Sequence, residues 1–217
     1  MSEKDNLELW RQVEKTDPRY TSKVNSRGGF TAIGAQYQTK EATKLWGPMG
    51  GTWGIRKLLY GMTLDAESNP IEIWAEGEFF YPDGAIEVAS DMTYKVGNDS
   101  RKKLRTDMMT KALSQLGFSA DVFMGLFDDN KYVQQRLHEV LVEEEWEEDR
   151  IGFCSTLDAL GFGYEEICLW QQARDKPRPS AMRRSEREIL LDWVSDRDNK
   201  DRVRYDIEAL SAHLEEA

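Results

Sequence analysis

Cysteine and histidine are both scarce in this chain, which has two of each among 217 residues. Cys154 and Cys168 form no CxxC pair and have no histidine cluster nearby, so the sequence supports neither a zinc site nor a disulfide framework. His138 and His213 have no serine, cysteine or aspartate at a spacing that suggests a catalytic triad. We therefore expect a protein without a metal ion and without a nucleophilic active site.

Long apolar stretches are also missing. No run approaches the roughly 18 apolar residues that a membrane span requires, and the N-terminal MSEKDNLELW contains no apolar signal segment. We expect an intracellular, cytoplasmic protein with no membrane partner. The glycine-rich stretch Gly47–Gly51 lacks the Lys-Ser/Thr ending of a phosphate-binding loop, so it predicts a turn, and we expect no nucleotide cofactor.

Acidic residues outnumber basic ones, and the formal net charge is −11. The excess is unevenly placed, because residues 1–136 hold 18 Lys and Arg against 19 Asp and Glu, whereas residues 137–217 hold 11 against 21. The total disfavours a polyanionic partner. Salt screens charges beyond about 8 Å, however, so a distant acidic region does not cancel a local basic groove. Nucleic-acid binding by residues 1–136 is therefore compatible with the composition.

Hydrophobic periodicity predicts an α+β fold for residues 1–136. Three strand-like stretches cover residues 52–62, 71–81 and 85–96, and Pro82-Asp83-Gly84 has the residue types of a hairpin turn, which predicts an antiparallel meander. The next segment, NDSRKKLRTDMMTKALSQLGF, predicts a long helix whose apolar arc, with Leu104, Met108 and Leu113, packs on the sheet. Shorter helices are predicted over residues 6–15 and 39–46.

Residues 137–217 are predicted to form a mostly helical, acidic C-terminal region. Helical patterns cover residues 155–173 and 185–216, and residues 174–184, rich in proline and arginine, predict a linker or mobile loop between them. The acidic run Glu143–Asp149 is most simply a solvated helix face, and alternatively an electrostatic gate or a docking segment.

Two groups of cations are candidates for binding phosphate. The denser group opens the long helix, where Arg105 is unexpected because it lies within the apolar arc. The other is interleaved with Trp53 and Tyr60, which are candidate base contacts because single-stranded nucleic acid binds where bases stack and cations follow the backbone. The alternatives are a solvated helix start for the first group and core packing for the tryptophan. The candidate phosphate ligands are Lys102, Lys103, Arg105 and Lys111 in the first group, and Lys40, Lys44, Arg56 and Lys57 in the second group.

Two rival functions use other residues. A metal-dependent nuclease could be assembled from Asp83, Asp129 and Lys131, since paired acids with a lysine can hold a metal ion and activate water. Asp83 is already explained as a hairpin tip, which weakens this reading. An interaction protein that mimics DNA through its acidic C-terminal region is the other rival.

Three segments resemble phage single-strand annealing proteins of the group similar to the eukaryotic Rad fifty-two recombination mediator. They are KTDPRYTSKV with RGGFTAI, EATKLWGPMGGTWGI, and RKKLRTDMMTKALSQLGFSADVFMGLFDDNKYV, and the likeness covers Leu9 to about Val133. The last segment is the most specific, with its basic start, Thr106-Asp107, and the Asp129 and Tyr132 of its ending.

This resemblance implies a β-β-β-α core that assembles into rings or helical filaments and anneals single-stranded DNA without ATP, in recombination and repair. It places Lys102 and Lys111 in the DNA groove and Lys40 nearby. The chain departs from the family pattern at two places. Ser114 stands where the eukaryotic relatives tend to carry a basic residue, which predicts a less positive groove, and the glycine-tryptophan turn reads Gly51-Thr52-Trp53. By analogy with other phage annealing proteins, the region from His138 onward would dock an exonuclease or the host single-strand binding protein, in the bacterial host cytoplasm if the chain is phage-encoded.

Overall fold

The computed structural model describes residues 5–25, 29–97 and 99–215. Its contacts divide the chain into two compact units, Met1–Val133 and Gln134–Ala217, and we describe each by itself. This division falls three residues before the boundary that the charge distribution suggested at Arg136. The first unit combines helices with two small antiparallel sheets, so the α+β class predicted for it is confirmed.

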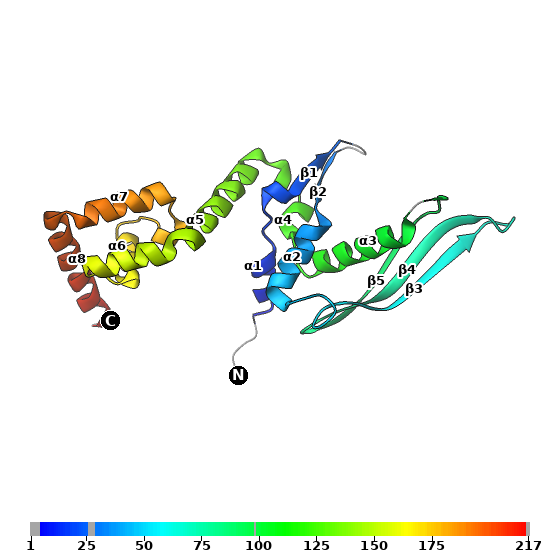
Figure 1. Ribbon diagram of the computed structural model, residues 1–217, viewed down its shortest axis with the longest axis horizontal. Helices are drawn as coiled ribbons and strands as arrows, with labels where there is room; N and C mark the ends of the chain where they lie inside the picture. Colours follow the sequence, from blue (N-terminus) through cyan, green and yellow to red (C-terminus); the bar gives the residue numbers. More distant parts are fainter. Residues whose placement is uncertain (1–4, 26–28, 98, 216–217) are drawn as a thin grey trace. The chain divides into compact units, whose positions relative to one another are not determined.

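The elements of the first unit are short except for the strands β3, β4 and β5 and the helices α2 and α3 (Figure 1). In chain order they are α1 (Glu8–Val13), η1 (Pro18–Tyr20), β1 (Thr21–Val24), β2 (Phe30–Ile33), α2 (Ala35–Trp46), β3 (Gly54–Leu64), β4 (Pro70–Tyr81), β5 (Gly84–Thr93), α3 (Ser100–Gln115), α4 (Ala120–Phe123) and η2 (Leu126–Asp128). The long helix α5 (Asn130–Leu160) starts here and continues into the second unit.

The larger sheet is the predicted antiparallel meander, with strand order β3-β4-β5. Tyr81 pairs with Gly84, so Pro82 and Asp83 are the two residues of the turn. Proline presets φ for such a turn and the glycine after it tolerates the chain reversal, which explains why this hairpin could be predicted from local sequence. The strand ends differ from the predicted ones by at most three residues.

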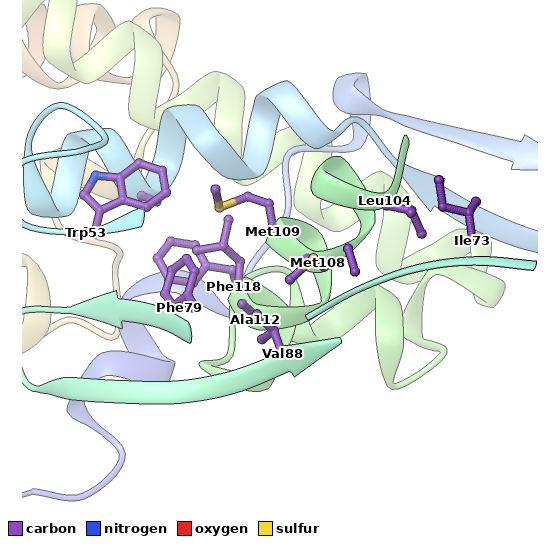
Figure 2. Close-up of a cluster of buried hydrophobic side chains, with 12 residues drawn as sticks. Trp53, Ile73, Phe79, Val88, Leu104, Met108, Met109, Ala112 and Phe118 are labelled. Atoms are coloured by element: carbon purple, nitrogen blue, oxygen red, sulfur yellow. The ribbon is translucent and has the colours of Figure 1, made fainter. Parts of the chain in front are cut away.

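Helix α3 covers one face of this sheet and supplies much of the core. Figure 2 shows Leu104, Met108 and Ala112 of α3 among side chains of the sheet, including Val88. The apolar arc predicted for α3 is confirmed, since Leu104, Met108, Met109, Ala112 and Leu113 are all buried. Burying each large side chain of this kind stabilises the fold by about 1.5–3 kcal/mol.

Helix α2 begins at Ala35, four residues before the predicted start at Thr39. The extra turn is helical because Tyr37 and Gln38 are both buried there. The Gln38 side chain donates to the carbonyl of Phe118 at 3.3 Å, and the Tyr37 hydroxyl accepts from the backbone N–H of Asp17 at 3.1 Å. Burial raises the pKa of Tyr37 to about 12, so its phenol stays protonated at neutral pH.

Asp121 at α4 is buried and connects distant parts of the first unit. Its carboxylate accepts from the backbone N–H and the hydroxyl of Thr16, at 2.8 and 2.6 Å, and from the Tyr132 hydroxyl at 2.9 Å. A buried carboxylate is tolerated only when it is hydrogen-bonded in this way. Tyr132, one of the residues that carried the family resemblance, therefore has a structural contact in the core of the unit.

The second unit is helical, and two of its predicted helices are interrupted. Residues 155–173 divide into the end of α5 and α6 (Tyr164–Gln172), because Gly161 takes a positive φ of 81° that favours glycine. Residues 185–216 divide at Asp196, which is extended, into α7 (Arg184–Ser195) and α8 (Arg197–Glu215). The loop between α6 and α7 contains the turn η3 (Pro179–Ala181).

The acidic run on α5 is solvated in part: Glu143, Glu144, Glu147 and Glu148 are exposed, as predicted, whereas Glu145 and Asp149 are half-buried in ion pairs. Glu145 accepts from the Arg183 side chain at 2.9 Å and from the backbone N–H of Arg184 at 2.7 Å. Arg183 holds the pKa of this carboxyl at about 2, well below its ordinary value. Asp149 pairs with the buried Arg187 at 2.9 Å. These ion pairs fix the C-terminal end of the 174–184 segment, which is therefore anchored and not a free linker.

No helix within the described ranges combines the length and the apolar character needed to cross a membrane.

Candidate nucleic-acid groove

An open hollow of 630 Å³ lies beside α3 in the first unit. It is bounded by the exposed side of α3, by the end of β5 and by the junction of β2 with α2. Its described lining residues are Ile33, Ala35, Ser90, Asp91, Met92, Asp99, Lys102, Lys103, Leu104, Thr106, Asp107 and Thr110. Segments far apart in the sequence thus form one surface, which combines two lysines with three hydroxyl groups and three carboxylates.

Asp107 lies at the centre of the polar contacts of this hollow. It accepts from the Ser90 hydroxyl on β5 at 2.6 Å and pairs with the Lys111 ammonium, one turn along α3, at 2.7 Å. The Thr110 hydroxyl donates to the Asp107 carbonyl at 3.0 Å. A carboxylate that already neutralises Lys111 competes with any phosphate for that lysine, so Asp107 limits the positive charge of the groove.

The cations of α3 differ in how far they are available to a ligand. Lys102 is exposed and lies 4.0 Å from Asp99, which is too long for a hydrogen bond. Lys103 lines the hollow and is exposed. Arg105 is also exposed, and no hydrogen bond or ion pair joins it to a described residue, although its position falls within the apolar arc. The Arg105 side chain thus reaches solvent.

Arg56 and Lys57 are not part of this groove. Both pair with Glu78 on the neighbouring strand, Lys57 at 2.9 Å. Side chains alternate between the two faces of a strand. Because Ile55 and its cross-strand partner Phe79 face the α3 side, Arg56 lies on the opposite face of the sheet. Lys57 lines a separate hollow that also contains Glu76, Glu78 and Glu87. Arg56 and Lys57, which belong to the second predicted group of cations, are therefore separate from the hollow beside α3, and Glu78 compensates their positive charge.

On α2, Lys44 pairs with Glu41 at 2.8 Å, whereas Lys40 lies over the ring of Tyr20 at 5.4 Å. Tyr20 is itself stacked on Tyr37, with ring centroids 4.8 Å apart, and is partly exposed. Neither lysine lines the hollow beside α3.

Trp53 is a core residue and not the base contact that the sequence suggested. It is 0% exposed, and its indole N–H donates to the Gly47 carbonyl at 2.7 Å. Its ring has no face available for stacking on a base. The other candidate, Tyr60, is half-buried, and the guanidinium of Arg101 lies 5.4 Å from its ring centroid.

Several residues of the hollow were not among the predicted site residues. Thr106 and Thr110 can hydrogen-bond a phosphate or sugar, although their hydroxyls now bond to helix carbonyls, whereas Ser90 is buried and donates to Asp107. A signal for them was present in the sequence. Ser90 is a polar residue on the apolar face of its strand, and the two threonines lie one helical turn apart on the outward face of α3.

The residues of the nuclease alternative have local structural explanations. Asp83 is in the exposed β4–β5 turn, and the Asp129 side chain caps the start of α5 by accepting from the backbone N–H of Lys131 at 2.8 Å. No group of three or more His, Cys, Asp or Glu side chains among the described residues could hold a metal ion.

Comparison with known proteins adds no family to this picture. No family model matches the chain, and no curated protein matches it in sequence. The resemblance to single-strand annealing proteins therefore stays a prediction that depends on the motifs quoted above.

Proposed function

We propose that this protein binds single-stranded DNA along the groove beside α3 and anneals complementary strands, as a homo-oligomer and without nucleotide or metal. The observation that supports it most directly is the hollow itself, where Lys102 and Lys103 lie beside hydroxyl groups on a surface shared by α3 and β5. The motif resemblance points to the same helix. Arg105, which forms no ion pair with a described residue, adds an exposed cation to the same end of α3.

Annealing by such a surface needs no bond-making chemistry. Two strands meet slowly because their phosphates repel and because self-pairing hides the bases. Cations along α3 neutralise part of the backbone, and the open form of the hollow leaves base edges accessible to a second strand. Binding of this kind is tolerant of sequence and strongly dependent on salt, with about 0.7 logarithmic units of affinity per phosphate neutralised for single strands.

Assembly into an oligomer is supported by two exposed apolar patches in the first unit. One is the outer end of the β3–β4 hairpin, which extends past the N-terminal end of α3 (Figure 1) and exposes Met62, Leu64 and Ile71. The other follows α3 and exposes Phe123, Met124 and Leu126. Contact between unlike patches is head-to-tail, and repetition of such a contact gives a ring when it closes and a filament when it does not.

The deciding experiment mixes two complementary labelled oligonucleotides with the full chain, in EDTA and without nucleotide, while light scattering reports particle size. We expect faster annealing by a large assembly. Replacing Lys102 and Lys103 together with alanine should weaken binding and reduce the dependence of log affinity on log salt by about 1.4. Unchanged affinity and slope in this variant would place the groove elsewhere. Magnesium-dependent cleavage that Asp129→Asn abolishes would instead establish the nuclease.

A further inference from the structure

A second open hollow, of 440 Å³, lies between α6 and α7 in the C-terminal unit. Two tryptophans form part of its lining, Trp170 and Trp193, which stack with ring centroids 5.7 Å apart and planes inclined by 22°. Met182 and Leu190 also line it. Ile189, at 69% exposure, completes the apolar surface. The described part of this unit leaves a broad apolar surface open to a ligand.

Two cations adjoin this apolar surface. The Arg174 guanidinium lies 4.9 Å from the centroid of the Trp170 ring, and its nearest carboxylate, on Asp206, is 3.7 Å away, which is longer than a hydrogen bond. Lys176 is exposed and forms no ion pair with a described residue. The carboxylate that lines the hollow, Glu186, is already used as a helix cap, because it accepts from the backbone N–H of Arg183 at 2.8 Å.

These two cations are unusual in their surroundings. Residues 137–217 hold 21 acidic against 11 basic residues. The arginines that open α7 are paired with carboxylates of α5, as Arg183 is with Glu145 and Arg187 with Asp149. The excess of acid disfavours a long polyanion such as DNA, whereas a short ligand that carries a few negative charges next to an apolar group can meet both the tryptophans and the cations.

We propose that the hollow between α6 and α7 is a docking site for a short acidic peptide segment of a partner protein. A leucine or aromatic side chain of that segment would fill the hollow against Trp193 and Ile189, and its carboxylates would pair with Arg174 and Lys176. Aromatic and arginine side chains around a pocket are typical of the few residues that carry most of the energy of an interface. All residues of this site lie in the C-terminal unit, so the proposal does not depend on the proposed DNA groove.

The test uses the full chain and dye-labelled peptides in which an Asp-Glu-Asp-Glu run precedes Leu-Phe, Leu-Leu or Trp-Leu, with fluorescence anisotropy as the readout. Two matched controls replace the acids with Asn and Gln, or the apolar pair with Ser-Ser. We expect at least one acidic peptide to bind in the micromolar range, and both controls to bind about tenfold more weakly or not at all. Binding should weaken as salt is raised.

Variants of the chain locate the site. Lys176→Glu and Ile189→Glu should each weaken binding of the acidic peptide about tenfold, because each places a carboxylate next to the acids of the ligand. Both residues are exposed, so the fold should survive. Ile151→Glu is the matched control, since Ile151 is 78% exposed in the same unit and does not line the hollow; its affinity should stay within about twofold.

Three outcomes would overturn the proposal. One is that no acidic peptide binds below a millimolar concentration. Another is that the neutral peptide binds as tightly as the acidic one, which would leave an apolar site without charge selection. The third is that labelled oligothymidylate binds and loses affinity through Lys176→Glu and Ile189→Glu but not Ile151→Glu, which would make the hollow a nucleic-acid contact.

Discussion

Replacing Asp107 with asparagine should strengthen the binding of single-stranded DNA, because it removes a negative charge from the lining of the proposed groove. Asp107 neutralises Lys111 at 2.7 Å, and both side chains are about half exposed. Such an exposed i, i+4 pair contributes only about 0.3–0.5 kcal/mol to stability. Asparagine is isosteric and can still accept from the Ser90 hydroxyl, which lies 2.6 Å from the carboxylate, so the fold should be retained.

The expected gain has two parts. In the wild type, Lys111 must leave Asp107 before it can bind a phosphate, which costs about 0.3–0.5 kcal/mol. The variant has no such ion pair, so this cost disappears. Removing a negative charge within about 4 Å of the bound phosphate adds on the order of 1 kcal/mol in a solvated groove. Together these predict an increase in affinity of roughly tenfold. If Lys111 then neutralises one further phosphate, the salt slope should increase by about 0.7.

Fluorescence anisotropy of labelled oligothymidylate across a range of NaCl concentrations measures both quantities. Asp83→Asn is the matched control, because it makes the same change in net charge at the β4–β5 turn, outside the lining of the groove. The reasoning fails if Asp107→Asn binds no more tightly than Asp83→Asn, or if its salt slope is unchanged. Thermal unfolding followed by circular dichroism would show that both variants are folded.

Three further predictions concern other parts of the chain. Trp53→Ala should destabilise the first unit by about 3–5 kcal/mol, since it empties a fully buried indole site, and urea unfolding should show no such loss if the ring were a surface base contact. Glu145 has a pKa of about 2 in the folded protein, below its ordinary value of 4.5, so its ion pair with Arg183 should stabilise the protein fully above pH 4.5 and progressively less as pH falls toward 2. The unfolding temperatures of the wild type and Glu145→Gln should therefore converge in acid. A difference that stays constant with pH would contradict this. Arg56→Ala with Lys57→Ala should leave oligonucleotide affinity within about twofold in the anisotropy assay, because both side chains are compensated on the face away from α3, and a tenfold loss would place DNA there.

Those elements whose signals are local could be predicted from the sequence. The apolar arc of α3 and the Pro82-Asp83 turn depend on residues near one another in the chain, and both are confirmed. The start of α2 was missed because its first turn is stabilised by tertiary burial, as the contact of Gln38 with the Phe118 carbonyl shows. The break at Asp196 was missed because the helical pattern continues across it.

The residues of the candidate site show the same difference between local signals and tertiary contacts. Lys102 and Lys103 were predicted as groove residues because they cluster in the sequence, and the structure places both in the hollow. The pairing of Arg56 and Lys57 with Glu78 could not be predicted, since it depends on the register of β3 against β4 and on an irregularity in the pairing after Arg56. Sequence shows where cations occur, but which carboxylate faces each one is decided by register and packing.

The oligomer contact can be tested through the asymmetry of its two patches. Met62→Glu places a charge in the patch at the end of the β3–β4 hairpin, and Phe123→Glu places one in the patch after α3; the native side chains are 56% and 60% exposed, so neither change should prevent folding. If the contact is head-to-tail, each variant keeps one intact patch. Neither variant alone should form large assemblies, because burying an unpaired carboxylate in an apolar contact is costly.

Mixing the two variants is the decisive step. The intact hairpin patch of Phe123→Glu can join the intact patch after α3 of Met62→Glu, so light scattering should detect dimers in the mixture and monomers in each variant alone. Leu59→Glu is the control, because Leu59 is 59% exposed on the opposite face of the same sheet and should leave the assembly of the wild type intact. A contact between like patches would give the reverse pattern, since each variant would then keep or lose assembly by itself and mixing would restore nothing.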